Sequence, residues 1–206
     1  GLLVVIFLRA VFTIATETCD AGGGGSIVSH FLHGPDAGKL INNTKKYHCL
    51  VYHSKTKTFR AEMPCLCARV SLIESYGQHA TYLYRFSPNE TYMLTGASMV
   101  QTKRTDQAFK HNNEIVVKYV RDEKLINEPF RILFADYKSC AVLSSLSLGV
   151  QLWVELGYLL KEHEIPYLCS LTYELATKGS GLRHVVYDWK ECPQRRSYKE
   201  ENSRAF

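Results

Sequence analysis

The sequence lacks the motifs by which common enzyme classes are recognised. It contains no Gly-x-Ser-x-Gly elbow, no His-Glu-x-x-His pair and no phosphate-binding loop. Its eight histidines are scattered singly. His163, between Glu162 and Glu164, is more typical of a solvated helix face than of an acid–base site. We therefore expect a protein that is not an enzyme and that carries no cofactor.

Metal-ligand spacing and a strong excess of charge are also missing. Cys65 and Cys67 are only one residue apart, and no second close Cys or Cys/His pair accompanies them, which argues against zinc. The net charge is only +5, and residues 193–206 carry four Arg or Lys against two Glu. The excess left on the rest of the chain is too small to indicate a nucleic-acid surface.

The N-terminal residues have the pattern of a secretory signal. Residues 2–8 are apolar and residues 10–15 continue with small side chains, but this stretch is short and interrupted by Arg9, which favours a signal peptide over a membrane anchor. Cleavage after Ala15 or after Ala21 fits the small-residue rule. Because Gly1 is not Met, we expect the true start to be missing. We expect residues 1–21 to be the signal and residues 22–35 a flexible Gly-rich leader, with an engineered linker as the alternative.

Cysteines are the strongest sign of an extracellular protein. The seven lie at positions 19, 49, 65, 67, 140, 169 and 192. In a secreted chain they should be oxidised, and the six beyond the signal allow fifteen pairings that spacing alone does not distinguish. Cys19 is the odd one, and cleavage after Ala21 would remove it.

Short alternating runs separated by turn signals predict eight strands. They cover residues 47–53, 65–75, 80–86, 92–100, 114–120, 130–137, 140–148 and 150–155. Residues 103–113 should be a loop and residues 121–127 a charged turn. Helices are expected at 36–43 and at 158–163, the second stopped by Pro166. This order predicts one all-β domain over residues 36–192, an up-and-down barrel with room for one small ligand, followed by a disordered polar tail at 193–206. A two-sheet sandwich is the alternative.

Specific sequence in the second half of the chain then adds a family resemblance. The segments are FRILFADYKSCAVL at 130–143, QLWV at 151–154, Ile165-Pro166-x-x-Cys169 and Tyr187-Asp188-x-x-x-Cys192. In the first half they are Asp36-Ala37-x-Lys39, Lys46-Tyr47-x-x-Leu50-Val51-Tyr52 and Cys65-x-x-Ala68-Arg69. Their order and spacing resemble the tick salivary histamine-binding lipocalins over residues 36–192.

The resemblance implies an eight-stranded antiparallel up-and-down lipocalin barrel with a short N-terminal helix and a C-terminal helix packed outside. It also implies the disulfides Cys65–Cys192 and Cys140–Cys169. Cys49 and Cys67 then remain, in adjacent predicted strands. They either form a cross-strand bridge or stay as two free buried thiols.

The function implied by the resemblance is the secreted, monomeric sequestration of small host mediators, above all histamine and serotonin. A buried amine needs carboxylates, which in the amine binders follow the strand-seven Cys and precede the Leu-Trp of strand eight. Ala141 and Gln151 stand at those positions here. Glu155 shares a strand face with Gln151 and Trp153 and is a candidate replacement counter-ion.

Because both charges are replaced, an apolar or lipid mediator competes with a biogenic amine as the ligand. Alternation along the strands makes Tyr84, Tyr119 and Phe130 further cavity candidates. We expect neither a nucleic-acid nor a membrane partner. The alternative is a protein-binding module that blocks a host defence protein through its loops. The sequons at Asn42 and Asn89 predict glycosylation.

Overall fold

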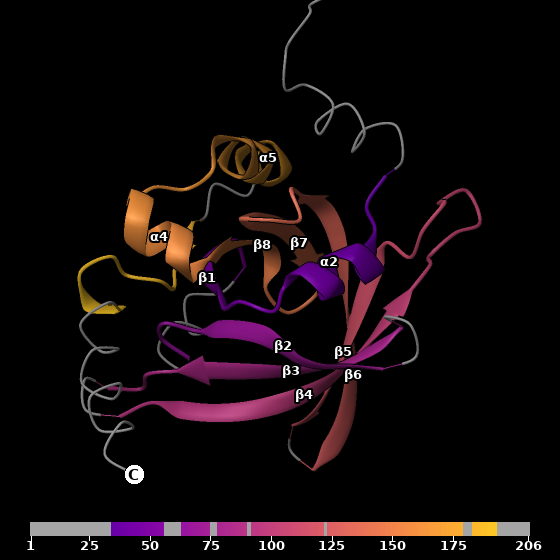
Figure 1. Cartoon of the computed structure of the whole chain (residues 1–206), viewed down its shortest axis with the longest axis horizontal. Helices are drawn as coiled ribbons and strands as arrows, with labels where there is room; N and C mark the ends of the chain where they lie inside the picture. The colour runs from indigo at the N-terminus through magenta and orange to yellow at the C-terminus, as the bar shows by residue number, and fades with distance from the viewer. Residues whose placement is uncertain are drawn as a thin grey trace, which may run out of the picture.

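The computed structural model describes residues 34–55, 63–74, 78–89, 92–121, 123–178 and 183–192. Eight strands pair antiparallel with their neighbours in chain order, and β1 pairs with both β8 and β2, which closes the sheet into a barrel (Figure 1). They are β1 (His48–His53), β2 (Cys67–Glu74), β3 (His79–Phe86), β4 (Leu94–Lys103), β5 (Glu114–Arg121), β6 (Lys124–Ala135), β7 (Cys140–Ser145) and β8 (Gly149–Glu155). The predicted up-and-down barrel is confirmed, and the sandwich is excluded.

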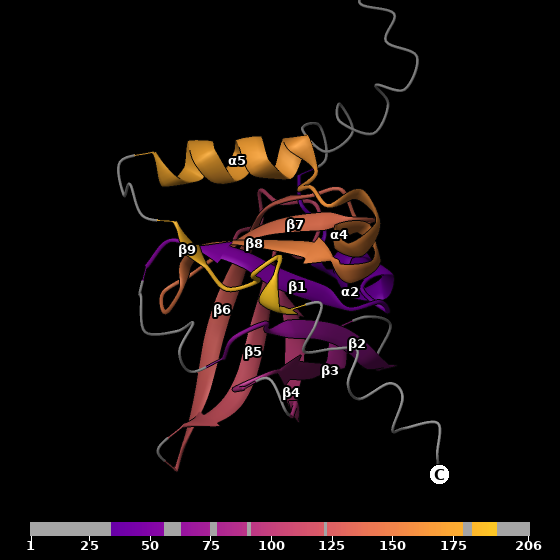
Figure 2. The same cartoon turned by 90° about the vertical axis from the view of Figure 1, so that its left-hand side faces the viewer.

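One strand differs substantially from its prediction. The expected charged turn at 121–127 is wrong, because β6 begins at Lys124 and forms a long hairpin with β5 that projects beyond the barrel (Figure 2). The strand predicted at 130–137 is present over 130–135, but it starts six residues earlier than expected. Pro129 obscured this strand in the sequence. Pro129 pairs with Val116 of β5, whereas the pairing of β6 with β7 begins only at Arg131. Because Pro129 has a partner strand on one side only, the N–H that proline lacks is not needed for a second strand.

Helix α2 (Ala37–Asn43) packs at one end of the barrel. The side chain of Asp36 caps its first turn by accepting a hydrogen bond from the backbone N–H of Lys39 at 2.9 Å. Leu40 and Ile41 are buried among residues from the barrel strands. The cap and the apolar face together fix this helix where it forms part of the cavity wall.

Two helices follow the barrel where one was predicted. They are α4 (Leu156–Glu162) and α5 (Tyr167–Thr177). Helix α4 ends with His163 as its C-cap, and Pro166, which was expected to stop this helix, is the N-cap of α5. Cys169 and Tyr173 of α5 are buried against Leu152 and Val154 of β8. Figures 1 and 2 show α5 lying across the outside of the barrel.

The barrel closes along a short seam. Strands β1 and β2 pair through only His48 with Ala68 and Cys49 with Cys67. Farther along β1, β9 (His184–Val185) takes the place of β2, and Val186 exchanges backbone hydrogen bonds of 3.0 and 3.2 Å with Val51 and Cys65. A segment near the end of the described chain therefore completes the closure.

Three disulfides hold this arrangement. Cys65–Cys192 and Cys140–Cys169 are formed, with Cα–Cα separations of 5.5 and 6.3 Å, and they are the pairs that the resemblance implies. Cys49 and Cys67 form the third bridge, directly across the seam, so the free-thiol alternative is wrong. The signal, most of the leader, Cys19 and the tail at 193–206 lie outside the described residues.

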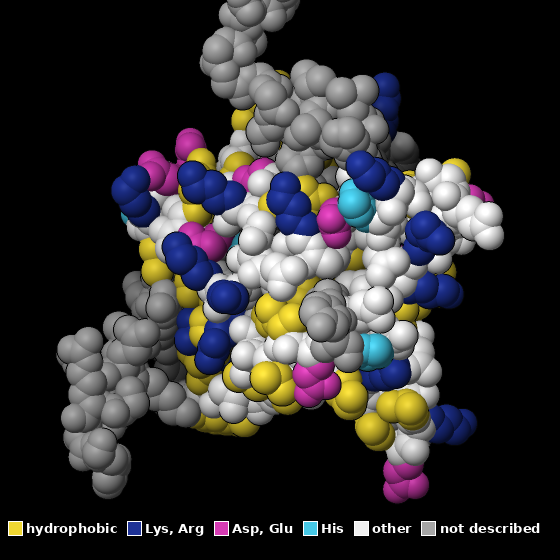
Figure 3. All heavy atoms as spheres, turned by 45° about the vertical axis from the view of Figure 1, so that its right-hand side comes forward, with side chains coloured by type: hydrophobic (Ala, Val, Ile, Leu, Met, Phe, Trp, Pro, Cys, Tyr) yellow, Lys and Arg dark blue, Asp and Glu magenta, His cyan; other side chains and the backbone are white. Residues whose placement is uncertain are grey.

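The surface shows no gathering of charge on the face drawn in Figure 3. Lys and Arg side chains are spread there among acidic, polar and hydrophobic ones. In the part of the chain that the structure describes, no helix is both long and apolar enough to cross a membrane.

Candidate functional site: the barrel cavity

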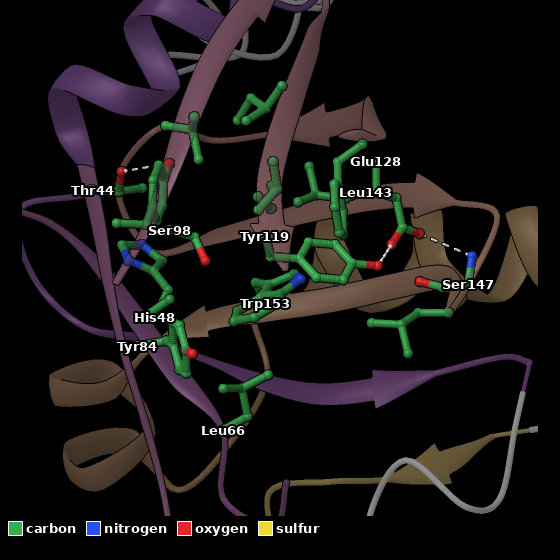
Figure 4. A pocket seen from close by; sticks show the side chains of 18 of the residues that line it. Thr44, His48, Leu66, Tyr84, Ser98, Tyr119, Glu128, Leu143, Ser147 and Trp153 are labelled. Atoms are coloured by element: carbon green, nitrogen blue, oxygen red, sulfur yellow. Dashed lines mark hydrogen bonds between the residues drawn. The ribbon is translucent and has the colours of Figure 1, made fainter. Parts of the chain in front are cut away.

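The barrel encloses a cavity of about 670 Å³ (Figure 4). This lies within the usual range for sites that hold one small molecule. Its wall is mostly aliphatic and aromatic, with a few polar groups. The lining residues are Leu40, Thr44, His48, Met63, Leu66, Ala68, Tyr82, Tyr84, Ser98, Val100, Ile115, Val117, Tyr119, Val120, Glu128, Phe130, Ala141, Leu143, Ser147, Leu148 and Trp153.

Most of the residues predicted for the cavity lie in its wall. The structure brings together Tyr84 of β3, Tyr119 of β5, Phe130 of β6, Ala141 of β7 and Trp153 of β8. They come from five strands because alternate residues of each strand point into the barrel.

Gln151 faces the interior but does not line the cavity. It is fully buried, donates a hydrogen bond from Nε2 to Ser145 Oγ at 2.9 Å and accepts one at Oε1 from Trp153 Nε1 at 3.0 Å. Gln151 therefore orients the indole of Trp153 and would not itself be the first group to meet a ligand.

Glu155 does not lie in the cavity either. Its carboxylate caps α4 by accepting hydrogen bonds from the backbone N–H groups of Gly157 at 2.9 Å and Tyr158 at 2.7 Å. Strand β8 ends at this residue, so the alternation that places Trp153 inside no longer directs the side chain of Glu155. The structure thus gives it the role of a helix cap.

A different carboxylate, which the sequence analysis missed, lies in the cavity wall. Glu128 of β6 is only 7% exposed. One carboxylate oxygen accepts a hydrogen bond from the hydroxyl of Tyr119 at 2.9 Å, and the other accepts one from the backbone N–H of Ser147 at 2.9 Å (Figure 4). Strand parity could have revealed it, because Glu128 is two residues before Phe130 and shares its face.

The carboxylate of Glu128 is held in its charged form. Burial raises its pKa, but hydrogen bonds from Ser147, Tyr119 and Ser145 outweigh burial and bring the pKa below its ordinary value. Among the described residues no Lys, Arg or His forms an ion pair with it. The cavity therefore carries one negative charge near neutral pH.

Polar groups of another kind lie toward α2, at the opposite side of Figure 4. His48 is 7% exposed, and its Nδ1–H donates to the carbonyl of Lys46 at 3.0 Å. Burial is the main reason that the pKa of His48 is lowered, so the imidazole is neutral and Nε2 is left as an acceptor. Nearby, the hydroxyls of Tyr82 and Thr44 lie 3.3 Å apart, and burial raises the pKa of Tyr82 to about 12.

The position of Tyr84 depends on a glycine. Tyr84 pairs with Gly96 on β4, and a Cβ added to Gly96 would lie 2.3 Å from atoms of the Tyr84 ring. The missing side chain gives the ring room to lie across the neighbouring strand. Gly96 thereby shapes this part of the cavity wall.

No three His, Cys, Asp or Glu side chains within the described ranges are grouped so that they could hold a metal ion. Asn42 and Asn89 are exposed, at the end of α2 and in the turn after β3. Their glycosylation stays a prediction.

A closed eight-stranded antiparallel barrel around one ligand-sized cavity, with a helix packed outside, defines a ligand-binding lipocalin. The family model described as tick histamine binding protein matches residues 33–194, and the chain belongs to that family. No curated protein sequence matches the chain.

Solved structures agree on the fold. The serotonin complex of AM182 superposes with a TM-score of 0.56 at 18% identity, covering 78% of this chain and 94% of that one. Insecticyanin from the tobacco hornworm Manduca sexta gives 0.51 at 10% identity, covering 73% and 82%. At these identities the likeness extends to the fold alone.

Proposed function

We propose that this chain is a secreted carrier that sequesters a small host mediator inside its barrel. The observation that carries the proposal is the cavity of about 670 Å³, walled mainly by aliphatic and aromatic side chains. Such a wall binds chiefly through the removal of apolar surface from water. The family, the serotonin bound by AM182 and three disulfides suited to an oxidising compartment support this role.

Calorimetric titration of the purified chain with histamine, serotonin and a leukotriene tests the proposal. A variant with a filled cavity provides the comparison. Leu143 lines the cavity, whereas Leu133 is 38% exposed. Leu143→Trp should abolish binding of any ligand that the native chain takes, and Leu133→Trp should leave it intact.

Two results would contradict the proposal. One is equal binding by the native chain and Leu143→Trp, which would place the ligand outside the cavity. The other is the absence of heat with every small molecule tested. That second result would favour the alternative of a protein-binding module that acts through its loops.

A further inference from the structure

The charge on Glu128 indicates the chemistry of the ligand that the cavity would hold. This carboxylate is more than nine-tenths buried in the cavity wall, and no cation pairs with it within the described part of the chain. Its hydrogen-bond donors, Tyr119 and Ser147 among them, are uncharged groups. They stabilise the carboxylate without neutralising its charge, which leaves a buried site complementary to a cation.

The groups around Glu128 also suit a cation. Figure 4 shows Tyr119 reaching Glu128 with its hydroxyl, and the aromatic rings of Tyr119 and Trp153 lying in this view between Glu128 and His48. Aromatic faces attract a protonated amine through their quadrupoles. An amine placed at Glu128 would therefore meet a full negative charge and have aromatic faces close by.

The cavity is larger than a small charged ring would fill. Its volume is about 670 Å³, and its lining extends from Ser147, beside Glu128, to His48 near α2 (Figure 4). The wall along this length is largely apolar, with Val117, Phe130 and Leu143 among its members.

We infer that the ligand is an amphipathic cation: a long or polycyclic apolar body with one protonated amine, the amine bound at the carboxylate of Glu128. This inference rests on the proposed function and specifies its ligand. The carboxylate belongs to β6, a different strand from those of Ala141 on β7 and Gln151 on β8. Gln151 lies nearby, because its Nε2 donates to Ser145 Oγ and Ser145 also hydrogen-bonds Glu128. The same charge disfavours a fatty acid, whose carboxylate would be buried beside a like charge.

Three probes with one apolar body test the role of charge. Dodecylamine, dodecanol and dodecanoate share a chain and carry a positive, a neutral and a negative head group at pH 7. Each is titrated into the purified chain in a calorimeter, below its aggregation concentration. The native chain should bind dodecylamine at least about 30-fold more tightly than dodecanoate, with dodecanol between them, as expected for a desolvated charge pair.

Glu128→Gln should remove this ranking. The substitution keeps the size of the side chain and an acceptor for Tyr119, but it removes the charge. Dodecylamine affinity should fall roughly 30-fold, dodecanoate affinity should rise, and dodecanol should change little. Glu74→Gln is the matched control, because Glu74 is an exposed carboxylate at the end of β2 and should leave all three affinities unchanged.

The outcomes separate this inference from the proposed function. If the native chain binds all three probes equally, or if Glu128→Gln retains the preference for the amine, the cavity function stands and the inference is wrong. If no probe binds, the inference is wrong, and the titrations with histamine, serotonin and a leukotriene decide the proposed function. Should Glu128→Gln fail to fold, the ranking of the three probes by the native chain decides on its own.

Discussion

Gln151 holds the indole of Trp153 through a hydrogen bond of 3.0 Å between Oε1 and Nε1. The two residues are neighbours on one face of β8, and only Trp153 lines the cavity. The amide of Gln151 therefore fixes the orientation of the Trp153 ring in the cavity wall.

Replacing Gln151 with leucine should leave the Trp153 N–H without its acceptor. An unsatisfied buried donor costs about 1–3 kcal/mol, so we expect a loss of that size in the free energy of unfolding, measured by urea denaturation. Gln151→Glu is the control, since its carboxylate oxygen can still accept the bond. A leucine variant as stable as the native chain would show that the hydrogen bond contributes nothing.

Histamine should bind the native chain weakly, because it is too small to fill the cavity and because Ala141 and Gln151 stand where the family's amine binders have carboxylates, which leaves Glu128 as the one acidic side chain in the described cavity wall. Ala141→Asp combined with Gln151→Glu should restore measurable binding in a calorimeter. Since Ala141 lines the cavity and Gln151 does not, most of the gain, at least about tenfold, should come from Ala141→Asp alone. Equal gains from the two single variants would contradict the placement of Gln151 behind Trp153.

Loss of the Cys49–Cys67 disulfide should loosen the barrel locally. Its ends are 18 residues apart, so replacing both cysteines by serine should lower the free energy of unfolding by about 3 kcal/mol in the chain-entropy view. Amide exchange should accelerate at Leu50, whose N–H donates to the carbonyl of Leu66 at 2.9 Å across the seam. The matched control is serine at Cys140 and Cys169, a bridge of 29 residues that joins β7 to α5 and does not cross the seam. Acceleration at Leu50 in both variants would show that the effect is global.

Acid should destabilise the fold through His53, which is fully buried beside His184. Burial, followed by repulsion from His184, lowers the pKa of His53 to about 4, against an ordinary value of 6.5. The unfolded chain therefore binds the proton first as the pH falls. Stability is fully present above about pH 6.5 and is lost as the pH falls toward 4.

Between pH 7.5 and 4.5 the contribution of His53 should cost about 2–3 kcal/mol of unfolding free energy. His53→Leu should remove that part of the pH dependence in urea denaturation, whereas His79→Gln should not. Identical pH slopes for His53→Leu and the native chain would refute the assignment. The buried His48, whose pKa is also lowered, shifts stability in the same direction and remains in both variants.

Alternation and turn signals were sufficient to predict the barrel, because residues 47–53, 80–86, 114–120 and 130–137 carry a period-two pattern and turn signals separate the other runs. They failed where one residue obscured the pattern. Pro129 concealed the start of β6 and with it Glu128, and Pro166 was interpreted as a stop although it begins α5. Glu155 shows a further limit: parity indicates a face only as long as the strand continues, and β8 ends at that residue.

The disulfides at the seam between β1 and β2 also determine when, during synthesis, the native set of bridges can form. Cys65 must wait for Cys192, 127 residues later, while Cys49 and Cys67 emerge from the ribosome close to it. A Cys49–Cys65 loop is only two residues shorter than the native Cys49–Cys67 loop, so loop-closure entropy does not distinguish them in the growing chain. Whether Cys49 pairs with Cys67 or with Cys65 therefore depends on when residues 184–192 reach β1 and bring Cys192 to Cys65. Oxidative maturation should therefore pass through shuffled disulfide isomers, and its rate should depend on a disulfide isomerase.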